Sequence, residues 1–333
     1  MADDAESPEI LWRPDAARIR RSHLARYLAR NGMAGYADLH RWSVEEPVAF
    51  WGELAVFCDL RWRRPPDAVL ADRGRMPGAR WFPGATLNYA ENLLRFGDDH
   101  PALVWRDERR ARGELSYRQL RAQAGRAAEG LRRLGVRPGD RVAAVLPNGP
   151  EAVIGMLATT SLGAIWSSCS PDFGVAGILD RFGQIAPKVL IATTGYDYAG
   201  RHFDTTAGLA RLAANLPGLA ALVWTGPLDQ VPDTFPETAE KVPDTCSWAE
   251  LTEHAQPLDF AAFPFDHPAC ILYSSGTTGP PKGIVHGAGG ILLQHLKEHL
   301  LHTDLHRADR LFYYTTCGWM MWNWLVGGLA SGA

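Results

Sequence analysis

The chain has 333 residues, of which 46% are hydrophobic and 21% charged, and its formal net charge is −3 at pH 7. This composition is typical of a globular protein with a large core, and the length favours more than one domain. The small negative charge argues against a protein that binds nucleic acid or an anionic membrane through bulk electrostatics.

The cysteines and the first residues bear on the cellular compartment. Cys58, Cys169, Cys246, Cys270 and Cys317 are scattered, without a CxxC pair. This spacing argues against a disulfide framework or a zinc cluster and favours a reducing, cytoplasmic location. The first ten residues, MADDAESPEI, are acidic and have no apolar core, so we expect no signal peptide.

The first part of the chain is predicted to be helical. Asp15 is a candidate N-cap for one helix through ARIRRSHLARYLAR, which closes at Asn31 and Gly32. Ser43 and Glu46 form the pattern of a capping box that opens a helix through FWGELAVFCDL. Residues 61–84 are rich in Arg, Pro and Gly, so we expect an irregular segment there that wraps around the rest.

From about residue 100 the pattern alternates between strands and helices. Ser116 with Gln119, and Asn148 with Glu151, are predicted capping boxes that open two of the helices. Short apolar strands separated by amphipathic helices favour a largely parallel sheet with helices on both faces. The expected strands are ALVWRD, RVAAVLPN, AIWSSCSP, KVLIATT and ALVWTG.

A second α/β run follows a Pro- and Asp-rich surface excursion at residues 226–268, which has one short helix, SWAELTEH. The run consists of a strand ACILYSS, a helix GGILLQHLKEHLLH, a strand DRLFYYTT and a final apolar helix. Residues 317–333 carry no charge, but they are at the short end of the roughly 17–25 residues that a membrane span needs. We expect a buried helix there and no membrane contact.

The predicted fold class is therefore α/β, with two α/β subdomains whose mainly parallel sheets are flanked by helices, preceded by a helical N-terminal segment. We place the boundary so that residues 1–96 form the N-terminal helical and wrapping segment and residues 97–333 the α/β domain.

A loop rich in Ser, Thr and Gly, YSSGTTGPPKGIVH at residues 273–286, follows the apolar strand that ends at Tyr273. Open α/β sheets bind ligands at the carboxyl ends of their strands. Hydroxyls and unobstructed backbone N–H groups can surround an anion here, because glycine lets the backbone come close to a ligand. Lys282 adds a positive charge, and Pro280 and Pro281 stiffen the turn before it. A polyphosphate fits all of these features.

Two other interpretations of the loop are weaker. A Walker A loop needs a glycine before its lysine and a Ser or Thr after it, but Pro281 and Gly283 stand at those positions. A flexible surface loop with an incidental lysine is the other alternative. The two prolines and the position between an apolar strand and a second α/β unit favour an anion site over it.

The loop resembles the phosphate-binding signature of the adenylate-forming acid ligases, which include acyl-CoA synthetases, luciferases and peptide-synthetase adenylation domains. WFPGATLNYAENLL, at residues 81–94, is similar to the N-terminal segment of the acetyl-CoA-synthetase branch. Residues 150–191 and 315–333 resemble the acetoacetyl-CoA synthetases in particular. The resemblance covers the chain from about residue 10 onward and implies that residues 97–333 are an AMP-binding (adenylation) domain.

The resemblance implies a two-step reaction without a covalent enzyme intermediate. ATP and a carboxylate, here acetoacetate, give an acyl-adenylate and pyrophosphate, and the coenzyme A thiolate then displaces AMP. Mg²⁺ is implied beside a threonine hydroxyl, Thr277 or Thr278, and no residue of this chain is assigned as catalytic. The residues implied to hold the β- and γ-phosphates are Ser274, Ser275, Gly276, Thr277, Thr278, Gly279 and Lys282.

The acyl pocket is implied to lie after the strand DRLFYYTT, at Gly318, Trp319 and Met320. Trp319, Trp322 and Trp324 can floor a short pocket for a four-carbon acid, with Asn323 available to a ketone oxygen. A Met/Trp stripe at helical spacing is equally an ordinary core, and for Trp322 and Trp324 that alternative stays open.

The histidines after the loop have a second interpretation. His295, His299, His302 and His306 recur near helical spacing, which suggests a metal site. Because no carboxylate is placed to join them, a solvated helix face is the favoured prediction. Ser167 and Ser168 lack a GxSxG elbow, so a hydrolase triad is not supported.

The family also uses a threonine-glutamate motif, a ribose-binding aspartate, a hinge and a small C-terminal domain with a lysine that engages the carboxylate and the α-phosphate. We find none of these in the 333 residues and expect an AMP-binding domain truncated at its C-terminal end. Such a chain is expected to bind ATP weakly and not to turn over alone. Three hypotheses remain: the front part of an acetoacetyl-CoA synthetase whose C-terminal half lies elsewhere, a ligase for another short-chain acid, and a non-catalytic nucleotide-binding fragment.

Overall fold

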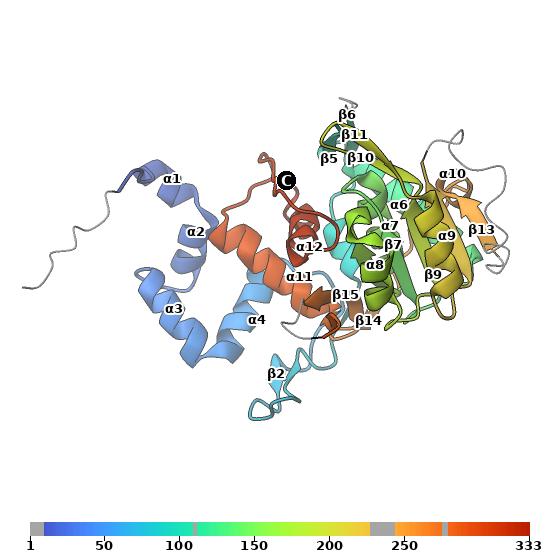
Figure 1. Ribbon diagram of the computed structural model, residues 1–333. Coiled ribbons are helices and arrows are strands. Elements are labelled where there is room, and N and C mark those ends of the chain that lie inside the picture. Colours follow the sequence, from blue (N-terminus) through green and yellow to red (C-terminus); the bar gives the residue numbers. More distant parts are fainter. Residues whose placement is uncertain (1–9, 109–111, 227–243, 275–278) are drawn as a thin grey trace, which may run out of the picture.

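The computed structural model describes residues 10–108, 112–226, 244–274 and 279–333. Figure 1 shows the N-terminal helices, in blue, on one side of helix α11 (Ala288–Lys297), and the main sheet with its helices on the other. Helix α11 thus lies between the two parts of the molecule. A shared core joins them, since Tyr27 and Leu54 of the N-terminal part belong to the same buried cluster as Leu292 and Leu296.

The N-terminal part is mainly helical, with short strands in the segment that wraps around the α/β domain. Its elements are α1 (Ala16–Arg21), α2 (His23–Arg30), α3 (Tyr36–Glu45), α4 (Pro47–Phe57), β1 (Trp62–Arg64), β2 (Leu70–Ala71), β3 (Arg80–Trp81), β4 (Thr86–Leu87) and α5 (Tyr89–Leu93).

A seven-stranded sheet forms the centre of the α/β part, in the order β13-β12-β9-β7-β8-β15-β16. Every neighbouring pair is parallel except β15 and β16, which form an antiparallel hairpin at the edge. The strands are β7 (Arg141–Val145), β8 (Ile165–Cys169), β9 (Val189–Thr193), β12 (Ala221–Thr225), β13 (Asp244–Ser247), β15 (Pro268–Ser274) and β16 (Lys282–Gly287).

The remaining elements are the helices that flank this sheet and several short strands. The helices are α6 (Tyr117–Arg133), α7 (Pro150–Ser161), η1 (Pro171–Phe173), α8 (Gly174–Phe182), α9 (Thr206–Asn215), α10 (Trp248–Leu251), the π-helix η4 (Glu298–His302), α12 (Met320–Gly327) and η5 (Gly328–Ser331). The strands are β5 (Pro101–Arg106) with β6 (Arg112–Ser116), β10 (Gly195–Tyr198) with β11 (Arg201–Asp204), and β14 (Phe263–Pro264), which joins β1 and β4.

Alternate residues of the central strands face opposite layers. Val142 and Ala144 of β7 belong to the buried cluster that includes α6, α7 and α11. Ala143 and Val145 belong to the second cluster, with α8 and α9. This period of two, on strands buried on both faces, produces the run of apolar residues in the sequence. The predicted α/β class, with a mainly parallel sheet flanked by helices, is confirmed.

Asp15 caps α1 as predicted, by accepting from Arg18 N, but one predicted helix span and two predicted helix starts are corrected. The first helix is interrupted at Ser22, whose hydroxyl accepts from Ala25 N and caps α2. Ser43 lies inside α3 and donates to His40 O, so the predicted capping box does not form; α4 begins instead at Pro47. At α7 the N-cap is Gly149 rather than Asn148, because the side chain of Asn148 contacts the C-terminal segment.

Two predictions at the end of the chain are also corrected. The expected strand DRLFYYTT has no strand structure: within the described residues no strand pairs with it. Residues Lys282–Gly287, predicted to belong to the loop, form β16, and β15 joins the central sheet instead of starting a second one. The final apolar segment forms the short helix α12, and no helix among the described residues is long and apolar enough to span a membrane.

The predicted capping box at Ser116 is confirmed, since Ser116 Oγ accepts from Gln119 N while Gln119 Oε1 accepts from Ser116 N. We expect Ser116→Ala to lower the free energy of unfolding by about 1 kcal/mol, because Gln119 N loses the hydroxyl that accepts its hydrogen bond at the start of α6. The matched control is Ser43→Ala, which should change stability by less than about 0.5 kcal/mol because this partly buried serine caps no helix. Urea titrations of both variants measure this; equal losses would contradict the assignment.

Candidate functional site

The carboxyl ends of β7 and β8 hold the segment that precedes α12. Ser168 Oγ donates to Cys317 O at 2.7 Å and accepts from Trp166 Nε1 at 3.1 Å. Asn148, just after β7, accepts from Trp322 Nε1 at 2.9 Å and donates to Thr315 O at 3.3 Å. The loop before α12 is therefore fixed at the edge of the sheet where open α/β folds bind their ligands.

The phosphate-loop candidate lies at the same edge, in the turn of the β15–β16 hairpin. Ser274 and Lys282 are directly paired at its mouth and both are exposed. Gly279 has φ +97°, a left-handed conformation that glycine adopts without steric cost. The predicted phosphate ligands Ser275, Gly276, Thr277 and Thr278 lie outside the described residues.

Helix α8 fastens this hairpin from the neighbouring layer. Gln184, just beyond α8, donates to Pro281 O at 2.8 Å, next to Lys282. Tyr273, at the end of β15, donates its hydroxyl to Arg181 O at 2.9 Å. The prolines and these two hydrogen bonds restrict the backbone on both sides of the loop, as a site that binds an anion through backbone groups requires.

Gly318 and Trp319 pack against the loop after β8. A Cβ at position 318 would lie 2.8 Å from Phe173 Cζ, so glycine permits the close approach. Trp319 contacts Phe173 edge-on, with ring centroids 6.4 Å apart, and remains 54% exposed. Both residues thus lie at the carboxyl edge, near the phosphate-loop hairpin.

Met320 has a different environment, because it lines a cavity of about 680 Å³ between the hairpin, α11 and α12. Its volume is in the range of small-molecule sites. Gly318 and Trp319 are not part of its lining, and Trp322 is fully buried core, whereas Trp324 does line it. The lining residues are Cys270, Leu272, Val285, His286, Gly287, Gly290, Ile291, Gln294, His295, Glu298, Met320, Met321, Asn323 and Trp324.

The predicted solvated histidine face is wrong for two of its four members. His295 and His299 are buried between α11, η4 and α12, and only His302 is fully exposed, with His306 partly so. Burial lowers the pKa of His295 to about 3 and that of His299 to about 4, so both rings are neutral near pH 7. His295 and His299 are four residues apart and therefore share one face of the helix. The prediction assigned this face to solvent, whereas it is buried.

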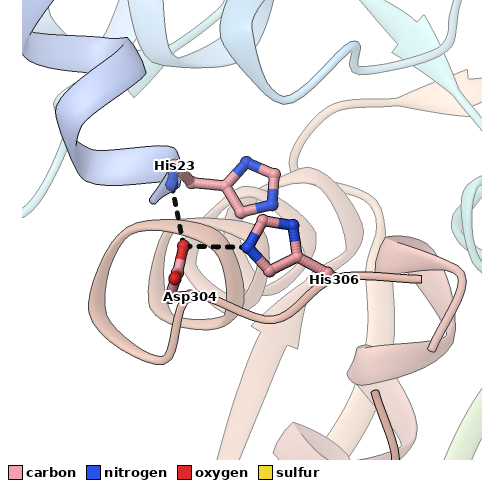
Figure 2. A group of neighbouring side chains, drawn as sticks. All are labelled: His23, Asp304 and His306. Atoms are coloured by element: carbon pink, nitrogen blue, oxygen red, sulfur yellow. Dashed lines mark hydrogen bonds and ion pairs between the residues drawn. The ribbon is translucent and has the colours of Figure 1, made fainter. Parts of the chain in front are cut away.

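One group of three possible metal ligands occurs in the described part of the chain: His23, Asp304 and His306, with ligand atoms within 4.8 Å of one another (Figure 2). Asp304 already accepts a hydrogen bond from the backbone N of His23 at 2.7 Å, and His306 Nε2 lies 3.3 Å from the same carboxylate. The two rings stack with centroids 4.3 Å apart. These contacts connect the start of α2 to the segment after η4, which accounts for the cluster without a metal.

The family follows from comparison with known proteins. Residues 90–333 match the AMP-binding enzyme family, and residues 36–93 match the acetyl-coenzyme A synthetase N-terminus. The chain belongs to the AMP-binding enzyme family. The adenylate-forming resemblance seen in the sequence is thereby confirmed.

Within this family, the chain is similar to individual acyl-CoA synthetases. The chain is 47% identical to the acetoacetyl-coenzyme A synthetase of Rhizobium meliloti (strain 1021), over 99% of this chain and 50% of the relative. It is 41% identical to a malonamoyl-CoA synthetase of Penicillium aethiopicum, over 99% of this chain and 48% of the relative. The solved acetoacetyl-CoA synthetase from Streptomyces lividans superposes with a TM-score of 0.91 at 46% identity, over 98% of this chain and 50% of that one. The chain spans about half the length of the relatives it matches.

The buried histidines predict a pH dependence of stability. Below about pH 6.5 an unfolded histidine takes up a proton that neither His295 nor His299 takes up in the fold, so the free energy of unfolding falls as the pH falls. Between pH 7 and pH 5.5 we expect each residue to contribute a loss of about 1 kcal/mol.

Urea titrations at both pH values measure this loss. His299→Gln should remove about 1 kcal/mol of the pH-dependent difference, whereas the exposed control His302→Gln should leave the difference unchanged. An equal pH dependence in wild type and His299→Gln would contradict the buried, neutral state of His299.

Proposed function

We propose that this chain forms the nucleotide- and acid-binding part of an acetoacetate–CoA ligase that works through an acyl-adenylate. The observation that carries the proposal is the position of two sites on one hairpin. Lys282, in the phosphate-loop candidate, and His286, in the cavity lining, lie on the same face of β16. Their separation of four residues corresponds to about 13 Å along a strand. One ligand pair, ATP and a short acid, can bridge this distance.

The residues divide the chemistry as follows. Ser274, Gly279 and Lys282, with Ser275, Gly276, Thr277 and Thr278 between them, hold the β- and γ-phosphates of ATP. Thr277 or Thr278 would hold Mg²⁺, which would offset the charge of the phosphates. Lys282 and the loop N–H groups stabilise the charge that develops on the leaving pyrophosphate.

Acid binding is assigned to the other end of the hairpin. Gly318 and Trp319 pack against Phe173 at the carboxyl edge, and Met320 forms part of the wall of the cavity. The acid is thereby held with its carboxylate toward the α-phosphorus, so that attack is in line. Coenzyme A then accepts the acyl group as the second substrate.

The domain arrangement and location are part of the proposal. Residues 1–96 are an N-terminal segment of the acetyl-CoA-synthetase type, and residues 97–333 belong to the adenylation domain. A cytoplasmic location agrees with the five free cysteines; burial raises the pKa of the Cys169 and Cys270 thiols to about 12.

A second candidate function is ligation of another short acid. The relative from Penicillium aethiopicum is named for malonamate rather than acetoacetate. Both acids carry a carbonyl group β to the carboxylate, so the two candidates share one substrate class. Measured rates with acetoacetate and malonamate decide between them.

The first test uses the complete gene product and measures ATP–pyrophosphate exchange. We expect exchange that depends on acetoacetate, and we expect Lys282→Ala to lower it by at least about tenfold because the developing phosphate charge loses its cation. Arg73→Ala removes the same charge from an exposed position on the wrapping segment and should leave the rate unchanged. Exchange that does not require an acid, or that Lys282→Ala does not affect, would count against the proposal.

We also propose that a polypeptide of only residues 1–333 does not turn over, since it spans about half the length of its relatives. The control is the complete gene product assayed under the same conditions. Acetoacetate-dependent AMP formation by the purified 333-residue polypeptide would refute this part. Equilibrium dialysis with ATP shows separately whether that polypeptide binds the nucleotide, as a non-catalytic nucleotide-binding fragment would.

A further inference from the structure

Five buried polar side-chain atoms near the inner end of the cavity have no hydrogen-bond partner within the described part of the chain. They are Asn323 Oδ1 and Nδ2, His295 Nδ1, and both ring nitrogens of His299. Asn323 is 1% exposed and His299 is fully buried. Buried amides and imidazoles are nearly always hydrogen-bonded, so this concentration of unpaired atoms requires a reason.

The backbone of α12 is shaped around these side chains. A Cβ at Gly327 would lie 2.6 Å from His295 Nδ1, so the backbone approaches this ring closely. Asn323 and Gly327 are four residues apart and share one face of α12. Glycine at 327 thus gives His295 room beside the face that carries Asn323. We call the three side chains Asn323, His295 and His299 the polar cluster.

Two members of the polar cluster lie in the wall of the cavity, with their unpaired atoms buried. Asn323 and His295 both line it, together with Met320, Met321 and Trp324. His299 lies behind them, with its ring 4.4 Å from that of Trp324 and 6.3 Å from that of His295. A small ligand that enters past Met320 therefore meets an apolar wall and a polar end.

The charge of the polar cluster determines which chemical group of a ligand it can bind. Burial holds both histidines neutral near pH 7, and an amide carries no charge. The charged group that lines the cavity is Glu298, which also accepts from Gln294 Nε2 and pairs with Lys297. A carboxylate has no cationic partner here among the described residues, whereas an uncharged carbonyl can accept a hydrogen bond from Asn323 Nδ2.

We propose that the polar cluster recognises an uncharged carbonyl group at the far end of the acid, through the side-chain amide of Asn323. This inference rests on the proposed ligase function, and it makes Asn323 a specificity-determining residue for acids with a β-carbonyl. His295, which also lines the cavity, and His299 behind it offer no cationic partner to a charged end group. A site built to hydrogen-bond a substrate group rejects an analogue that lacks it, because its own polar atoms then stay unpaired.

The test compares three acids with the complete gene product: acetoacetate, malonamate and butyrate. Butyrate has the chain length of acetoacetate but no β-carbonyl. We expect wild type to favour the β-carbonyl acids over butyrate by at least about 100-fold in kcat/KM. Asn323→Leu should bring this ratio below tenfold, mainly through a higher KM for acetoacetate and malonamate and with butyrate little changed.

The matched control is Asn215→Leu, which removes an exposed amide that donates to Arg211 O and does not line the cavity. It should leave the ratio unchanged. Asn323→Ser is a second, smaller variant in case Asn323→Leu does not accumulate, and it should also lower the ratio. Preservation of the wild-type ratio in the Asn323 variants would overturn the inference.

A second readout does not depend on activity. If Asn323 is unpaired in the free protein, Asn323→Leu should raise the urea midpoint of unfolding, and acetoacetate should raise the melting temperature of wild type but not of the variant. A lower urea midpoint for Asn323→Leu would mean that the amide has structural partners, which would overturn the inference.

The two proposals fail in different ways. If the wild-type protein shows no acid-dependent ATP–pyrophosphate exchange, the proposed function is wrong. The urea and melting measurements then still test the role of Asn323. Active wild-type protein that treats butyrate and acetoacetate alike, or whose selectivity survives Asn323→Leu, defeats only the inference.

Discussion

The hydrogen bond from Ser168 Oγ to Cys317 O joins the sheet to the C-terminal segment, and the candidate site depends on it. It is buried, and Trp166 Nε1 donates to the same hydroxyl, so Ser168 is held in one orientation. Trp322, hydrogen-bonded to Asn148, fixes the other end of the segment. Since α12 starts between these two anchors, its rotation about its own axis is set by the sheet. That rotation directs Met320 and Asn323 toward α11.

The β15–β16 hairpin couples the anion site to the cavity in a different way. One strand carries Lys282 at its beginning and His286 near its end, so the distance between the two sites is a property of backbone geometry. Helix α8 restrains the turn through Gln184 and Tyr273. In the proposed function, pairing of the two strands aligns phosphate and acid without a large side-chain network.

Much of the fold could be predicted from the sequence because its signals are local. The capping box at Ser116 and the apolar runs of β7, β8, β9 and β12 each correspond to an observed element. The errors arose where a distant partner decides the structure. Asn148 has the sequence of an N-cap, but Trp322 and Thr315, more than 160 residues away, take its side chain. DRLFYYTT has strand propensity, but a strand needs a neighbour, and within the described residues it has none.

The candidate site could be predicted only in part, again because some of its residues are distant from one another in the sequence. The loop was found because glycine, hydroxyl residues and lysine are adjacent in the chain, whereas the cavity is assembled from β15, β16, α11 and α12. The four histidines were predicted to lie on a solvated helix face because no carboxylate is placed in the sequence to complete a metal site with them. The burial of two of them beside an unpaired asparagine is a conflict between local chemistry and fold. Such conflicts are typical of functional sites, and the role in substrate choice that we propose for Asn323 accounts for this one.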